Sequence, residues 1–198
     1  MNRWSDDPDE SLALAESVAG QAVAKDANEP LARFAASLAA MFGKDLVRSA
    51  SEAEAALSLN PNYALAYNTL GTVRIYSGEP MAAIPLIERA MRLDPAWTKQ
   101  YLHFLGTAYL LAGKYETAAA LLKQRIVMAP NTDFSRAILA SALGHLGEVD
   151  EARRVWGELM EINPKYSFSG HFRRQPFKRP EDVQRVADGL IAAGLTPG

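Results

Sequence analysis

The chain has 198 residues, 48% of them hydrophobic, and its 21 Lys and Arg against 23 Asp and Glu leave a formal net charge of -2. This composition is enough for one domain with a buried core, and the near-zero charge excludes the overall basic surface of a nucleic-acid-binding protein. The chain contains no cysteine, which excludes disulfide bridges, thiolate metal sites and cysteine nucleophiles.

The first ten residues are polar and acidic, unlike the basic and then apolar start of a secretory signal. No apolar run approaches the roughly 18 residues that span a bilayer. We therefore expect a cytoplasmic protein that does not enter a membrane.

Residues 7–29 are predicted to form one helix. Asp7 is a suitable N-cap, Pro8 a suitable first helical residue, and Glu10 can fold back on the cap. Because residues 12–25 resemble the second helix of a repeated pair, we interpret this segment as half a repeat whose first helix is missing.

Residues 30–164 contain four repeats, which the prolines mark. Pro61, Pro95, Pro130 and Pro164 lie 34, 35 and 34 residues apart, the period of helix-turn-helix solenoids. The repeats cover residues 30–61, 64–95, 98–130 and 133–164. Each proline ends a second helix, because it lacks the N–H that would continue it.

Small residues recur in register with these prolines. They are predicted to let the two helices of a pair approach to about 8–10 Å, and the glycines after the first helices are predicted to end them in the left-handed conformation. The mid-helix positions are Ser37, Gly71, Gly106 and Ala140, faced by Ala83, Ala118 and Ala152, and the turn glycines are Gly78, Gly113 and Gly147.

Two positions depart from this pattern, and two further prolines lie within a second helix. Lys44 replaces a turn glycine, and Arg125 replaces the small residue at Ala90, which predicts looser packing in the third repeat. Pro80 suits the first turn of a second helix. Pro85 lies about one turn further in, and we expect a slight bend there.

Residues 165–198 are predicted to form a basic link followed by a helix that begins at Pro180 and ends at Gly194. Its apolar stripe consists of Val183, Val186, Ala187, Leu190 and Ile191. A solenoid needs its exposed end covered, so we expect this helix to cap the array. The fold class is therefore all-α, a right-handed α-solenoid of antiparallel helix pairs in one domain spanning residues 1–198.

The repeat residues resemble the tetratricopeptide-repeat (TPR) family over about residues 30–164. A narrower resemblance covers nearly the whole chain. The sequences AlaGlyLysTyrGlu at 112–116, AsnProLysTyrSerPhe at 163–168, ProPheLysArgProGluAsp at 176–182 and GlyLeuIleAlaAlaGlyLeu at 189–195 are similar to the tail of bacterial class III adenylate or guanylate cyclases. That resemblance implies a regulatory module whose catalytic domain lies elsewhere, although Thr196, Pro197 and Gly198 replace the usual acidic close.

Catalytic interpretations fail on their chemistry. Class III cyclases need two metal-binding aspartates on a sheet, and no strand-rich segment is present to carry them. Residues 112–115 superficially resemble a phosphate loop, but Tyr115 stands where a Ser or Thr is required. The histidines, His103, His145 and His171, are too far apart for a local metal motif. Glu148, Asp150 and Glu151 suit a solvated helix start. We therefore predict no enzyme activity, no cofactor and no metal.

The function is then expected on the concave face, where the first helices of successive repeats line a groove. The residues predicted to bind a protein or peptide segment there are Leu65, Asn68, Thr69, Thr72, Gln100, His103, Phe104, Thr107, Phe134 and Ser141. TPR proteins that grip a C-terminal carboxylate use Lys, Asn and Arg, whereas this chain has Phe34, Leu38, Thr69, Gln100 and Phe104. The groove favours a segment with apolar anchors and few charges. Alternatively, Phe34, Leu38 and Phe104 pack only against neighbouring helices.

Three hypotheses remain open. The leading one is a non-catalytic protein-interaction scaffold, the regulatory TPR module of a class III cyclase whose catalytic domain is one candidate partner. The second is a self-association module that forms homodimers. The third is nucleic-acid binding through Arg173, Arg174, Lys178 and Arg179, which the sequence favours least and which would show a steep salt dependence.

Overall fold

A computed structural model describes residues 7–196 and shows, within that range, eleven α-helices, one short 3-10 helix and no strand. The helices are α1 (Pro8–Lys25), α2 (Pro30–Phe42), α3 (Leu46–Leu59), α4 (Ala64–Tyr76), α5 (Pro80–Leu93), the 3-10 helix η1 (Pro95–Trp97), α6 (Thr98–Leu111), α7 (Tyr115–Met128), α8 (Phe134–His145), α9 (Val149–Ile162), α10 (Phe168–Arg174) and α11 (Pro180–Ala192).

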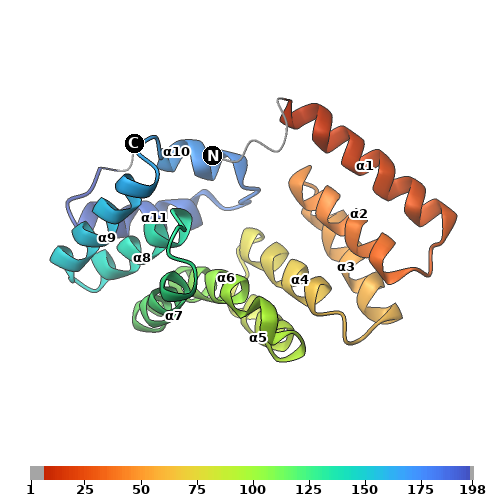
Figure 1. The fold of residues 1–198 in the computed structure, drawn as a ribbon, viewed down its shortest axis with the longest axis horizontal. Coiled ribbons are helices and arrows are strands. Elements are labelled where there is room, and N and C mark those ends of the chain that lie inside the picture. The colour runs from red at the N-terminus through yellow and green to blue at the C-terminus, as the bar shows by residue number, and fades with distance from the viewer. Residues whose placement is uncertain (1–6, 197–198) are drawn as a thin grey trace.

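The helices form an arc of antiparallel pairs (Figure 1). The pairs are α2 with α3, α4 with α5, α6 with α7 and α8 with α9, and each second helix also packs on the first helix of the next pair. In Figure 1 the arc runs from α1 at the upper right, round α5 and α7 at the bottom, to α9 at the left. The all-helical solenoid predicted from the repeats is confirmed.

Small side chains bring the two helices of a pair together, as predicted. A methyl group added at Gly71 would lie 2.5 Å from Cγ1 of Ile87, and one at Gly106 would lie 2.5 Å from Cγ of Leu122. In the first pair, Ser37 and Ser49 are buried and each hydroxyl donates to the other residue's backbone carbonyl, at 2.7 and 2.8 Å. Reciprocal hydrogen bonds satisfy these buried polar groups.

The turns within the pairs use left-handed backbone, as the glycine pattern predicts. Gly78, Gly113 and Gly147 have φ of 81°, 75° and 76°. Lys44 stands at the equivalent turn with φ of 66°, the positive-φ position among the described residues that is not glycine. The first repeat therefore keeps the turn geometry with a residue that rarely adopts it.

Helix α1 begins as predicted, with Asp7 as N-cap accepting from the backbone N–H groups of Asp9 and Glu10 at 3.0 and 3.1 Å. It packs against α2, as the second helix of a half repeat would. Leu14 and Val18, one turn apart on α1, remain 64% and 55% exposed.

The C-terminal segment, defined here as residues 165–196, differs from the sequence-based expectation. The stretch predicted as a link contains the seven-residue helix α10, capped by the Ser167 hydroxyl. Helix α11 packs on α8 and also contacts α6, and therefore covers the inner side of the last pairs. Just after α11, the Ala193 carbonyl accepts a hydrogen bond from Nε of Arg153 on α9, at 2.9 Å.

Two glycines position α11 against α8. A methyl group at Gly144 would overlap the Gly189 carbonyl oxygen, and one at Gly189 would overlap the Ser141 carbonyl oxygen. The backbones of the two helices are therefore in direct contact, which larger residues at either position would prevent.

Candidate protein-binding groove

The residues predicted to line the groove lie on the first helices α4, α6 and α8. Six are half-buried and retain some exposed surface: Leu65, Asn68, Gln100, His103, Phe104 and Phe134. The others, Thr69, Thr72, Thr107 and Ser141, are at most 4% exposed.

Several of the buried polar side chains already have partners within the chain. The hydroxyls of Thr72 and Thr107 donate to carbonyls one helical turn back, those of Asn68 and His103, both at 2.9 Å. The Ser141 hydroxyl donates to the Val186 carbonyl of α11 at 2.8 Å. The hydroxyl hydrogens of Thr72, Thr107 and Ser141 are therefore already donated within the chain.

The inner face divides into two halves. We call the part over α6 and α8 the filled half, because the C-terminal segment covers it. The ring of Phe134 stacks on His171 with centroids 3.8 Å apart and contacts Phe172 at 5.6 Å. On the same half, His145 stacks on Tyr115 and its Nε2 donates to the Arg185 carbonyl at 2.8 Å.

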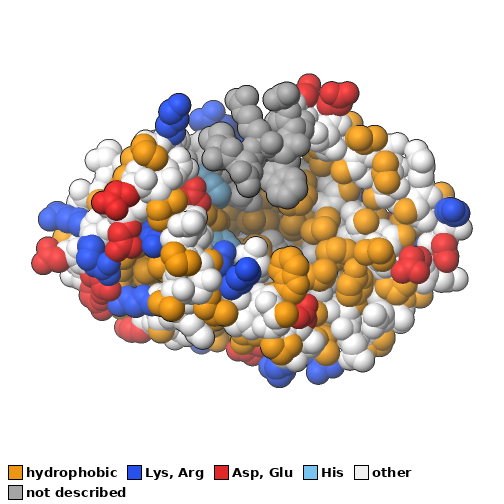
Figure 2. Space-filling model, in the orientation of Figure 1, with side chains coloured by type: hydrophobic (Ala, Val, Ile, Leu, Met, Phe, Trp, Pro, Cys, Tyr) orange, Lys and Arg blue, Asp and Glu red, His pale blue; other side chains and the backbone are white. Residues whose placement is uncertain are grey.

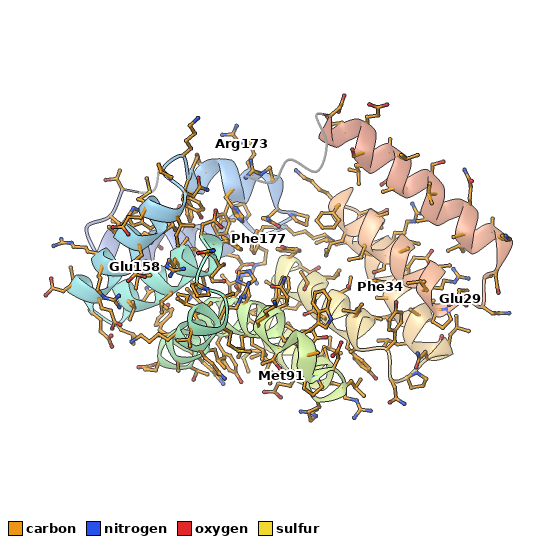
Figure 3. The ribbon with its side chains drawn as sticks, in the orientation of Figure 1. Glu29, Phe34, Met91, Glu158, Arg173 and Phe177 are labelled. Carbon is orange, nitrogen blue, oxygen red and sulfur yellow. The ribbon has the colours of Figure 1, made fainter. Side chains whose placement is uncertain are left out.

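The segment also crosses to α4 at the middle of the arc. The Tyr76 hydroxyl donates to Oε1 of Gln175 at 2.7 Å, and the Lys178 amide donates to the Tyr76 carbonyl at 2.8 Å. The Tyr76 and Phe177 rings meet edge to face at 4.9 Å, and Phe177 lies at the centre of Figure 3. Residues a hundred positions apart in sequence are thus joined on the inner face.

Two of the histidines of the filled half, His103 and His171, are held neutral. Burial, together with the positive charge of Arg125 and with His171, lowers the pKa of His103 to about 3. Burial, with a smaller effect of Arg174, lowers the pKa of His171 to about 4. Nδ1 of His103 lies 3.0 Å from the Ser135 hydroxyl. At neutral pH these two side chains are therefore uncharged.

We call the inner face of α2 and α4 the open half, and it carries Phe34, Leu38, Leu65 and Asn68. All four side chains are half-buried, and the Phe34 ring tilts against Tyr63 with centroids 5.2 Å apart. Figure 3 shows Phe34 between α2 and α4, and Figure 2 shows hydrophobic side chains gathered over that region. The side-chain oxygen Oδ1 of Asn68 is buried, and none of the described residues donates a hydrogen bond to it.

Among residues 7–196, no group of three or more His, Asp or Glu side chains is arranged to hold a metal ion. Across the same residues, every helix is too short or too polar to cross a membrane.

The sequence analysis did not identify the residues that fill the groove, His171, Phe172 and Phe177. It also did not identify Tyr76 of α4, which Phe177 contacts. One signal was available, because Phe168 and Phe172 are four apart after Ser167, a good N-cap. Because basic residues surround them, the stretch was instead predicted to be a link.

Comparison with known proteins supports the repeat architecture. The family profile described as "Anaphase-promoting complex, cyclosome, subunit 3" matches residues 81–159. Protein FlbA of Caulobacter vibrioides (strain ATCC 19089 / CIP 103742 / CB 15) is 35% identical in an alignment of 106 residues that covers 50% of this chain and 17% of FlbA. The chain thus corresponds to a minor part of the length of that relative.

Solved structures show the same fold. A thermophilic TPR protein of Thermus thermophilus has a TM-score of 0.65 at 21% identity, covering 92% of this chain and 90% of its own. YrrB, described as a TPR protein with an unusual peptide-binding site, has a TM-score of 0.62 at 18% identity, covering 88% and 90%. MamA has a TM-score of 0.64 at 20% identity, covering 79% and 89%.

Together, the arc of helix pairs and these likenesses define a helical-repeat solenoid. More specifically, the chain has the fold of TPR repeat proteins, with four helix pairs flanked by α1 and the C-terminal segment.

Proposed function

We propose that this chain is a non-catalytic interaction scaffold that binds a segment of another protein on the open half of its inner face. The observation that carries the proposal is the apolar surface of α2 and α4 at Phe34, Leu38 and Leu65, which are half-buried and keep some of that surface exposed. The C-terminal segment packs on α6 and α8, and it reaches the open half at Tyr76, the last residue of α4, and at Lys44, which follows α2. Apolar side chains on a concave face favour a partner segment with apolar anchors.

Asn68 supports a role in binding more than a role in stability. Its side-chain oxygen is buried without a donor, which costs free energy in the unbound chain. A backbone N–H of an incoming segment could supply the missing donor. We therefore expect Asn68→Ala to leave the chain as stable as before or slightly more stable, and to weaken partner binding about fivefold, because a buried hydrogen bond contributes about 1 kcal/mol.

The test uses a partner captured from the source cell and then purified. The partner is titrated calorimetrically against the wild-type chain, the Leu65→Glu variant and the matched Val127→Glu variant. Val127 is 80% exposed on α7, a second helix of the array. We expect at least tenfold weaker binding for Leu65→Glu alone. Equal affinities for all three chains would contradict the proposed site.

The finer part of the proposal is that the scaffold regulates a class III nucleotide cyclase. Its support is the similarity of residues 112–116, 163–168, 176–182 and 189–195 to the tails of those enzymes. The test is to titrate this chain into a purified class III catalytic domain from the same organism and to follow cyclic nucleotide formation. A saturable change that Leu65→Glu abolishes is expected, whereas an unchanged rate at every concentration would reject this role.

A second candidate, self-association, is favoured by α1. Its exposed Leu14 and Val18 face solvent where the first helix of a complete repeat would pack. Sedimentation over a hundredfold concentration range would reveal a dimer, and Val18→Glu should abolish it. A constant monomer mass would reject this candidate.

A further inference from the structure

We propose that the filled half of the groove binds a short helical segment of a partner that carries two phenylalanines four residues apart, and that residues 166–179 are the resident occupant such a partner displaces. This inference rests on the proposed role of the inner face as a binding surface. It concerns α6 and α8, however, rather than the open half.

The resident segment shows which side chains this surface accepts. Phe168 and Phe172 lie one turn apart on α10, with ring centroids 4.4 Å apart, and are 6% and 5% exposed. Phe172 meets Phe134 of α8, and Phe177 then contacts both Phe172 at 5.6 Å and Tyr76. The anchors are thus aromatic and spaced as one helical face requires.

The surroundings of the anchors favour uncharged aromatic side chains. On the receiving surface, His103 is neutral at physiological pH, and Arg125, whose charge helps to lower the pKa of His103, is 9% exposed. That buried positive charge would repel a cationic anchor. The basic residues of the occupant, Arg173 and Arg174, are exposed, so we do not expect their charge to determine which segment binds.

The occupant is attached in a way that permits exchange. Within the described part of the chain, no ion pair joins residues 165–179 to the repeats. Helix α10 has seven residues, one of them Gly170, and so short a helix depends on the surface beneath it. The repeat pairs, in contrast, are closed by their own contacts between first and second helices.

A tethered occupant lowers the apparent affinity of any competitor. The competitor binds only the fraction of molecules in which the segment has left the groove, and the tether gives the segment a high effective concentration. Weakening the resident anchors should therefore strengthen binding in trans. A permanently built-in structural strap would show no such effect.

The experiment uses a fluorescent peptide with the sequence of residues 165–179 and full-length chains. Binding is measured by anisotropy to the wild-type chain and to the Phe172→Ala chain, whose own anchor is weakened. We expect at least tenfold tighter binding by the Phe172→Ala chain. The matched control peptide, with alanine at both positions 168 and 172, should bind neither. All titrations are repeated in chains that also carry Leu65→Glu. Because this substitution is expected to abolish binding on the open half, the affinity of the peptide for the filled half is then measured separately.

Equal binding of the peptide by both chains, or no binding to a Phe172→Ala chain that retains wild-type circular dichroism, would overturn the proposal. A second measurement tests the proposal without the Phe172→Ala chain, in case that variant does not fold. In the wild-type chain, hydrogen exchange of the α10 amides should be at least a hundredfold faster than that of α8. Exchange of α10 only at the rate of α8 would show a permanently seated segment and would also overturn the proposal.

Discussion

The contact between α8 and α11 makes a specific prediction about Gly144. An alanine methyl at Gly144 would overlap the backbone carbonyl oxygen of Gly189 and lie 3.3 Å from Cβ of Ala193. Because the obstructing atom belongs to the backbone, α11 must shift as a whole. Gly157, in the middle of α9, is the matched control, because a methyl there would meet no atom within 4 Å.

The expected magnitude follows from the difference between the two variants. Replacing a glycine inside a helix by alanine gains up to about 1 kcal/mol of intrinsic helix stability at either position. Overpacking at Gly144 costs about 1–3 kcal/mol in addition. Since the intrinsic gain is common to both, Gly144→Ala should be less stable than Gly157→Ala by about 1–3 kcal/mol.

Urea unfolding followed by circular dichroism measures this difference. The Gly157→Ala chain should be slightly more stable than the wild type and the Gly144→Ala chain less stable. Hydrogen exchange should in addition become faster in α11 of the Gly144→Ala chain. Equal free energies of unfolding for the two variants would refute the close contact of α8 and α11.

Three further predictions concern stability. Burial lowers the pKa of His103 to about 3 and of His171 to about 4, so both histidines take up protons at higher pH in the unfolded chain than in the folded one. Their contribution to the free energy of unfolding is therefore complete above pH ~6.5 and falls by about 1–2 kcal/mol per histidine at pH 5. An unchanged urea midpoint between pH 7 and pH 5 would contradict it. Pro85 is exposed inside α5. Pro85→Ala should therefore restore a helix hydrogen bond and raise the free energy of unfolding by about 1–3 kcal/mol. A lower melting temperature of the variant would contradict this prediction. Arg125 is 9% exposed, and among the described residues its Nε and Nη1 have no hydrogen-bond partner. Arg125→Met should therefore leave the free energy of unfolding in urea unchanged or raise it by up to about 2 kcal/mol. A clearly lower free energy of unfolding would contradict this and would mean that the charge is compensated.

The repeats could be predicted from the sequence because their physical requirements are local. Gly78 is needed where a first helix ends in left-handed backbone, and Gly71 where Ile87 approaches. Each requirement recurs at a fixed offset, so the pattern is visible without knowledge of the distant chain.

The filling of the groove could not be predicted in this way, because it depends on contacts between distant residues. Tyr76 meets Gln175 across 99 positions, and Ser141 meets Val186 across 45. No periodicity marks such pairs. Gly144 and Gly189, which allow α11 onto the inner face, fall inside helices where a glycine alone has several explanations.

The central claim is that the open half of the inner face holds a partner segment, and site-specific photo-crosslinking tests it most directly. A photoreactive amino acid replaces Leu65 in one chain and Val127 in another, and each is irradiated with the purified partner. The account predicts a crosslink at position 65, located at an apolar anchor of the partner and suppressed by excess wild-type chain, with none at position 127. Retained binding without a crosslink at position 65, or an equal crosslink at position 127, would contradict it.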